Sequence, residues 1–239
     1  MIHHIPGPAG RLEALIDDPA ALCTTGQPGT DPLAPASPPR AAVVVAHPLP
    51  VQGGTMHTKV VFQAAKAFCR LRCAVLRFNF RGVGASEGAF DQGRGEALDF
   101  RAALDFMAGR YPGVTMWAAG FSFGAWIAME TGATDDRVSL LLGIAPPVAL
   151  YDFPGVRASA KPKFFVQGER DELCPLRALR EFYAQIQEPK ELAVIDAANH
   201  LFDGHVSEVG DAIEELLGDW GSGAGDSGLG VRGRDWTRG

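Results

Sequence analysis

The chain has 239 residues, enough to bury a full hydrophobic core, and its apolar fraction of 46% and charged fraction of 21% are ordinary for a globular protein. A net charge of −6 argues against a nucleic-acid surface and against a basic stripe for anionic lipid. The sequence has no apolar run long enough to span a bilayer, and its first residues lack the pattern of a signal peptide. We therefore expect a cytoplasmic protein that binds neither nucleic acid nor membranes.

The first forty residues fall into two parts. Residues 2–5 and 11–16 predict short strands joined by a glycine- and proline-containing turn at 7–10, which together form an antiparallel hairpin at the edge of a sheet. Residues 18–40 carry six prolines and little periodicity. This composition predicts a surface connection rather than a helix or strand.

From residue 41 onward, strand patterns and helix patterns alternate. Repeated strand-helix units predict a mostly parallel twisted sheet of about eight strands with helices on both faces, in a single α/β domain over residues 1–220. The glycine-rich residues 221–239 lack an apolar pattern and are expected to be disordered. The predicted strands are 41–46, 73–80, 114–119, 138–144, 163–167 and 191–195, and the predicted helices are 56–69, 96–108, 176–186 and 206–217, with another beginning near 125.

A Gly-Phe-Ser-Phe-Gly pattern at residues 120–124 lies between a predicted buried strand and a predicted helix. The flanking glycines relieve the collisions of a strained strand-to-helix turn, which leaves the serine hydroxyl exposed at the carboxyl end of the sheet. The helix N-terminus beneath it favours developing negative charge. This pattern predicts that Ser122 is a nucleophile. A serine that only capped the helix would leave the acid and histidine downstream unexplained.

A serine nucleophile needs a base within hydrogen-bond reach and an acid that orients the base. In this architecture the acid and the histidine follow the serine in that order, each on a loop just after a strand. Asp171 follows the predicted strand 163–167, and His200 follows the predicted strand 191–195. The sequence therefore predicts a triad of Ser122, His200 and Asp171.

Backbone N–H groups that hold the oxyanion are expected from two places. One is Phe123, directly after the nucleophile, and the other is the loop after the strand at 41–46. In that loop Pro48 and Pro50 have no N–H to donate, so Leu49 is the predicted donor, with the glycines at 53–54 as the fallback.

Several other features of the sequence could indicate a binding or catalytic role. His47 lies beside this loop, and either supports the site or is a structural histidine. A Gly-Val-Gly loop at 82–84 follows a strand, but Glu87 replaces the third glycine of a dinucleotide fingerprint and would oppose a pyrophosphate. No metal-ligand spacing is present, so neither metal nor cofactor is expected. Buried reduced thiols are predicted for the four cysteines, Cys23, Cys69, Cys73 and Cys174.

Eight stretches of the chain match one known family, residues 7–13, 47–48, 53–56, 76–88, 120–124, 145–147, 151–153 and 198–204. On these motifs the chain resembles the α/β-hydrolase superfamily, and within it the small single-domain bacterial serine hydrolases related to dienelactone hydrolases. The resemblance implies the same nucleophile, acid and base as the pattern above. It also makes Asp152 the alternative acid, because some hydrolases carry the acid after that earlier strand, and it raises a homodimer as a candidate assembly.

Two departures limit what the resemblance carries over. Leu49 stands where such sequences often have a second histidine, so any part of that imidazole in substrate choice is lost, although a backbone donor survives. Dienelactone hydrolases use a cysteine nucleophile, whereas this chain has Ser122. Their substrate is therefore not expected here.

Only residues 145–162 separate the strand after the elbow from the acid-bearing strand, which is too short for a large cap domain. We expect an open site and a serine esterase that cleaves small to medium acyl esters through an acyl-enzyme. The alternatives are acyl transfer to an alcohol or peroxide on the same triad, and a binding protein on an inactive hydrolase fold. Candidate pocket residues, which equally fit core packing, are Phe121, Val148, Leu150, Tyr151, Phe153, Leu201 and Phe202.

Overall fold

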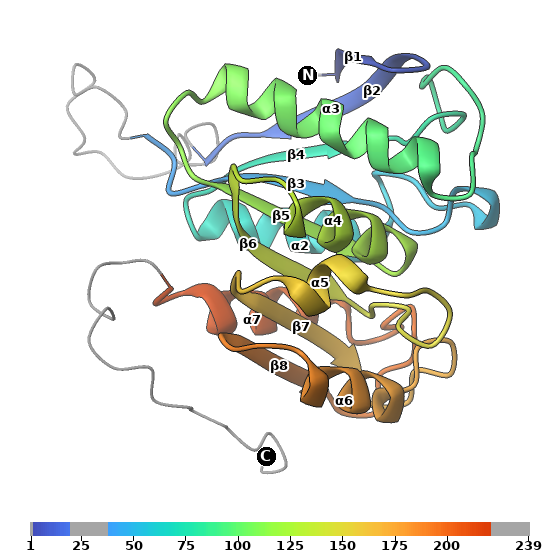
Figure 1. Ribbon diagram of the computed structural model, residues 1–239, viewed down its shortest axis with the longest axis vertical. Coiled ribbons are helices and arrows are strands. Elements are labelled where there is room, and N and C mark those ends of the chain that lie inside the picture. The colour runs from blue at the N-terminus through green and yellow to red at the C-terminus, as the bar shows by residue number, and fades with distance from the viewer. Residues whose placement is uncertain (1, 20–37, 221–239) are drawn as a thin grey trace.

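A computed structural model of the chain describes residues 2–19 and 38–220 (Figure 1). Most of the expected proline-rich connection, the expected disordered tail and Cys23 lie outside the described residues. The helical elements are η1 (Pro50–Gln52, a 3₁₀ helix), α2 (Lys59–Arg70), α3 (Arg94–Arg110), α4 (Phe123–Ala133), α5 (Pro154–Ala158), α6 (Leu176–Gln185) and α7 (Val206–Leu217). The strands are β1 (Ile2–Gly7), β2 (Gly10–Asp17), β3 (Ala42–Ala46), β4 (Ala74–Phe78), β5 (Met116–Phe121), β6 (Val138–Ile144), β7 (Lys163–Gly168) and β8 (Lys190–Ile195).

In the described residues these strands form one eight-stranded sheet in the order β1-β2-β4-β3-β5-β6-β7-β8. β1 pairs with β2, and β2 with β4, in antiparallel fashion, whereas every pair from β4 to β8 is parallel. The expected fold, with its antiparallel hairpin at one edge, is confirmed. Because the parallel strands point the same way, the loops after β3, β5, β7 and β8 meet at one edge of the sheet.

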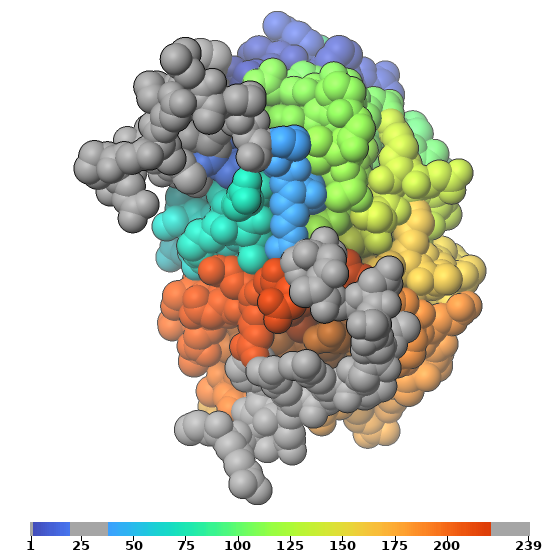
Figure 2. Space-filling model, turned by 90° about the vertical axis from the view of Figure 1, so that its left-hand side faces the viewer, coloured from blue at the N-terminus to red at the C-terminus, as the bar shows by residue number. Residues whose placement is uncertain are grey.

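Helices cover both faces of the sheet, which explains why strands such as β3 and β4 are buried along their whole length. Figure 1 shows α3, α4, α5 and α6 in front of the sheet and α2 and α7 behind it. One hydrophobic cluster joins α2 and α7 to the sheet, and the other joins α3, α4 and α6 to the opposite face. α2 and α7 also lie side by side at the surface seen in Figure 2. Figure 2 shows the end of the molecule at which the parallel strands begin, which is opposite the loops after β3, β5, β7 and β8.

The predicted element limits agree with the structure for β6 and α7 and shift elsewhere. The helix predicted from residue 56 begins at Lys59, because residues 55–58 form a hydrogen-bonded turn that ends at the N-cap Thr58. The strand predicted at 114–119 is displaced to Met116–Phe121 and so ends directly before Ser122. Two short elements, η1 and α5, are not predicted from the sequence.

Cys69, Cys73 and Cys174 are buried and unpaired, as expected. Burial raises the pKa of both Cys69 and Cys73 to about 12, so these thiols are protonated at neutral pH. Across residues 2–19 and 38–220 we find no helix with the length and apolar character needed to cross a membrane.

Candidate active site

Ser122 stands at a sharp turn between the last residue of β5 and the first residue of α4. Its φ of 54° and ψ of −123° are strained for a residue with a side chain. Both flanking glycines are needed for close backbone approach, since a Cβ on Gly120 would lie 2.2 Å from the Gly124 carbonyl oxygen, and one on Gly124 would lie 2.4 Å from that of His47. The turn has the geometry expected of a nucleophile elbow.

Three side chains from three different loops form one hydrogen-bonded chain. His200 Nδ1 lies 2.8 Å from Asp171 Oδ2, and His200 Nε2 lies 2.9 Å from Ser122 Oγ. An ionised carboxylate can only accept, so Nδ1 carries the ring proton and Nε2 is left to accept from the serine hydroxyl. The Asp171 side chain is fully buried, whereas 11% of the His200 side chain is exposed. Because Nδ1 donates to Asp171, the ring has the tautomer that a general base requires, with Nε2 free to accept a proton.

Asp171 accepts hydrogen bonds at both of its oxygens. Oδ1 accepts the backbone N–H groups of Leu173 (2.9 Å) and Cys174 (2.7 Å). Oδ2 accepts the Gln167 side-chain amide at 2.9 Å in addition to the His200 ring. These donors fix the carboxylate in one orientation and stabilise its charge in a buried position.

The acid loop and the histidine loop are tied to each other. The Arg170 N–H donates to the Ala198 carbonyl at 2.9 Å, and the Ala197 N–H donates to Glu169 Oε2 at the same distance. A Cβ on Gly168 would lie 2.5 Å from the Ala198 carbonyl oxygen, so glycine is required where β7 meets the histidine loop. The separation of Asp171 and His200 is thus set by backbone contacts as well as by their own bond.

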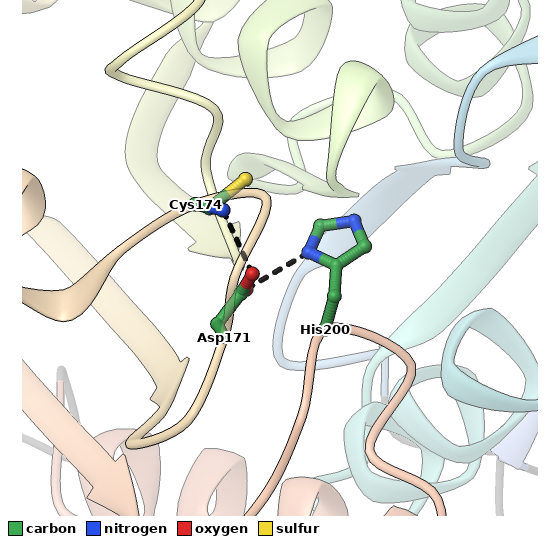
Figure 3. Close-up of side chains that lie close together, drawn as sticks. All are labelled: Asp171, Cys174 and His200. Atoms are coloured by element: carbon green, nitrogen blue, oxygen red, sulfur yellow. Dashed lines mark hydrogen bonds and ion pairs between the residues drawn. The ribbon is translucent and has the colours of Figure 1, made fainter.

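Among the described residues, one group of three side chains could hold a metal ion. It consists of Asp171, Cys174 and His200, whose possible ligand atoms lie within 4.8 Å of one another. Figure 3 shows the Cys174 amide and the His200 ring both bonded to the Asp171 carboxylate. Burial raises the pKa of the Cys174 thiol, and the Asp171 charge raises it further, so the thiol is protonated. A metal would have to displace that proton and the existing hydrogen bonds, so the arrangement suits proton transfer better than metal binding.

His47 is fully buried beside the loop that is predicted to donate to the oxyanion. Its Nδ1–H donates to the Pro48 carbonyl at 2.7 Å, and its Nε2 accepts the Phe80 N–H at 3.0 Å. Burial lowers the pKa of His47 to about 4, so the ring is neutral at pH 7. Of the two interpretations left open by the sequence, the contacts show a structural histidine that ties the loop before η1 to the loop after β4.

The candidate pocket residues divide into two groups. Val148 and Tyr151 are half-buried, and Leu150 and Leu201 are 67% and 55% exposed. The other three are buried in the two hydrophobic clusters instead of lining an open pocket, and these are Phe121, Phe153 and Phe202. The ring centroids of Phe121 and His200 lie 5.4 Å apart, so Phe121 packs against the histidine.

Asp152, the alternative acid, lies away from His200. Its side chain is 76% exposed, caps the N–H of Phe153 at 2.9 Å and lies 3.6 Å from Arg157. The structure therefore brings Asp171, and not Asp152, to the histidine.

Two features near the site are missed by the sequence analysis. One is the Gln167 contact with Asp171, because a glutamine at a strand end carries no sequence signal for its partner. The other is an aromatic group at the elbow, in which Trp126 stacks on Tyr151 at 4.3 Å and both rings contact Phe123. Trp126 lies in the first turn of α4, close in sequence to Ser122, and this proximity is the one signal that the sequence offers.

Comparison with known proteins yields matches over most of the chain. The family model Hydrolase_4, described as serine aminopeptidase, S33, matches residues 37–161. An α/β serine hydrolase homologue from Coxiella burnetii is 36% identical with a TM-score of 0.80, and the match covers 91% of this chain and 97% of that one. An α/β serine hydrolase without lid from Xanthomonas campestris is 32% identical with a TM-score of 0.80, covering 92% and 94%. An uncharacterised protein of Rickettsia prowazekii is 35% identical over 220 residues, covering 88% and 86%.

Proposed function

Since the chain belongs to the α/β-hydrolase superfamily of serine hydrolases, we propose that it cleaves carboxylic esters of small to medium acyl groups through Ser122, His200 and Asp171. The observation that carries this proposal is the hydrogen-bonded chain from Asp171 through His200 to a serine at a strained turn. The narrower kinship with dienelactone-hydrolase-like enzymes is part of the same proposal.

The reaction follows from the atoms of this chain. The Ser122 oxygen attacks the ester carbonyl while His200 Nε2 takes its proton, and Asp171 stabilises the imidazolium that forms. The backbone N–H groups of Phe123 and Leu49 hold the oxyanion. His200 then returns the proton to the leaving alcohol, which leaves an acyl group on Ser122. A water molecule gives its proton to His200 and attacks the acyl carbonyl, and Ser122 recovers its proton as the acid departs.

An open site supports small to medium substrates. The link between β6 and α5 spans only residues 145–153, and α5 has five residues, so little chain is present to cover Ser122. The Xanthomonas relative is itself described as a hydrolase without lid. Leu150 and Leu201 present exposed apolar side chains on loops at this edge, which favours an apolar acyl group over a charged substrate end.

The test is intact-mass analysis after treatment with a fluorophosphonate probe. The wild type should gain one adduct, and Ser122→Ala should gain none and lose nearly all ester turnover while remaining folded. Ser207→Ala, which changes an exposed serine in α7, is the matched control and should label like the wild type. Absence of an adduct on folded wild type would contradict the proposal and favour a binding protein on a hydrolase fold.

A panel of esters of increasing acyl length tests the substrate class. Turnover should be highest for short and medium chains, and a maximum at long chains would contradict this part of the proposal. Adding an alcohol or a peroxide as a competing acceptor shows whether water is the true acceptor, because acyl transfer gives a new ester or peracid in place of the acid.

A further inference from the structure

Gln167 is buried at the carboxyl end of β7, on a strand whose other side chains are almost all apolar. Alternation along the strand puts Phe164 and Val166 in one hydrophobic cluster and Phe165 in the other. Gln167 lies on the same face as Phe165, where the pattern calls for another apolar side chain. The presence of a buried polar amide at this position therefore has to be explained by its contacts.

The orientation of the amide follows from what surrounds it. Gln167 Nε2 lies 2.9 Å from Asp171 Oδ2 and 2.6 Å from the Cys174 carbonyl oxygen. Both neighbours are acceptors, so the NH₂ group must face them and the amide cannot be flipped. The two bonds span the turn from Asp171 to Cys174 and fasten both of its ends to β7.

This orientation leaves the other half of the amide without a partner. Among the described residues, Gln167 Oε1 is the one buried side-chain nitrogen or oxygen atom with no hydrogen bond. A buried unpaired carbonyl is destabilising, and a hydrophobic side chain of the same size would avoid it. What the amide supplies at this place, and a hydrophobic side chain would not, is its two N–H donors.

We propose that Gln167 is a positioning residue of the catalytic triad, which aims Asp171 Oδ2 at His200 by donating to that oxygen and to the Cys174 carbonyl. This inference rests on the proposed function of the triad. Gln167 does not touch the serine or the substrate, and it acts through Asp171. The groups near the His200 ring are the Asp171 carboxylate, the Ser122 hydroxyl, the Phe121 ring and the protonated Cys174 thiol.

The test compares the wild type with Gln167→Leu, which keeps the side-chain volume and removes the amide. Loss of a hydrogen bond to a charged group is expected to lower kcat about 10- to 100-fold, while KM for the same ester changes little because the substrate contacts remain. The melting temperature should change little, because two opposite effects offset each other. Removing the unpaired Gln167 oxygen is stabilising, whereas the loss of the partner of the Cys174 carbonyl is destabilising. Gln167→Met should behave alike, which separates the amide from the shape of the side chain.

Lys163→Met is the matched control. Lys163 is buried at the other end of β7, and its ammonium donates to the carbonyls of Lys161 at 2.8 Å and Gln187 at 3.2 Å, far along the strand from Asp171. Its replacement should lower the melting temperature and leave kcat per folded molecule near the wild-type value. If the role of Gln167 were purely structural, its variants would behave like this control, with a lower melting temperature and a kcat per folded molecule near that of the wild type.

A measurement that needs no substrate decides the inference independently of the ester reaction. The proton between His200 Nδ1 and Asp171 should give a far-downfield resonance in the NMR spectrum of the wild type. In Gln167→Leu and Gln167→Met that resonance should move upfield or broaden through exchange with water, and in Lys163→Met it should stay. Unchanged resonance in the Gln167 variants, or no such resonance in the wild type, would overturn the inference even if the enzyme proves inactive on esters.

Discussion

Two buried aspartates in this molecule are held in contrasting ways. Asp99, on α3, accepts both the Nε and Nη2 groups of Arg81 at 2.9 and 2.7 Å and the Arg81 backbone N–H at 3.0 Å. Asp171 is equally inaccessible, but its four donors are backbone N–H groups, a neutral amide and an imidazole. One carboxylate is paired with an arginine, whereas the donors of the other include no arginine or lysine.

The difference separates a structural ion pair from the carboxylate that we propose is catalytic. The Arg81 guanidinium stays charged near neutral pH, so the Arg81–Asp99 pair is a permanent ion pair that links the loop after β4 to α3. In the proposed mechanism, the Asp171 carboxylate faces the imidazole that takes up the Ser122 proton as the serine attacks the substrate. In that mechanism, Asp171 stabilises the positive charge that arises on His200 during the reaction.

Neutralising Asp171 should have the largest effect. Asp171→Asn keeps the size of the side chain but favours the wrong tautomer of His200, and kcat is expected to fall about 10⁴-fold. Asp152→Asn, at an exposed carboxylate away from His200, is the control and should keep wild-type rates. Steady-state ester kinetics on both variants checks this, and the acid assignment would be wrong if the two results were exchanged.

Breaking the structural pair should affect stability instead of chemistry. Arg81→Met leaves Asp99 buried without its cation and is expected to lower the free energy of unfolding by about 3–5 kcal/mol. The double variant Arg81→Met with Asp99→Leu should recover much of this loss. Urea denaturation of the three proteins measures the effect, and a single variant as stable as the wild type would show that the pair is dispensable.

His47 should make stability depend on pH. Its pKa is about 4 in the folded protein and 6.5 in the unfolded chain, so the unfolded chain binds a proton first as the pH falls. Stability is therefore complete above pH 6.5 and is lost between pH 6.5 and about 4, by up to about 3 kcal/mol. Denaturation at pH 7 and pH 4.5 should show a smaller drop for His47→Gln than for the wild type. Equal drops would mean that other groups carry the effect.

The smallest expected effect concerns the exposed apolar side chains near the site. Leu150→Ser and Leu201→Ser should each raise KM for a medium-chain ester by roughly 3- to 10-fold, because each side chain loses apolar contact with the acyl group, while kcat changes little. Leu98→Ser, at an exposed leucine of α3, is the matched control and should leave KM as it is. A larger KM change in Leu98→Ser would place the acyl group elsewhere.

The fold and the order of the proposed triad are readable in the sequence because their signals are local. Glycines two positions on either side of Ser122 are required by close backbone approach, and the periods of β6 and α7 predict their observed limits. Asp171 and His200 follow apolar strands that must run parallel, so topology alone brings them to one edge. None of these inferences needs a side-chain contact.

Other features depend on contacts that no local pattern encodes. The choice between Asp171 and Asp152 depends on the paths of two loops, and the sequence left both open once the family resemblance was considered. Whether Phe121, Phe153 and Phe202 face solvent or core depends on how their elements and loops pack into the two hydrophobic clusters. The bonds of Gln167 join residues that are near only after β7 and its loop have packed.

By itself, the sequence determined an α/β fold, a serine at a strained elbow and a histidine after the last strand, since apolar period, glycine spacing and chain order are properties of the chain alone. Only the tertiary structure decided which carboxylate lies against that histidine, that His47 is a neutral buried support, and that a buried glutamine amide donates to the acid. These depend on hydrogen-bond geometry within a few ångströms, which exists only when distant segments are packed together.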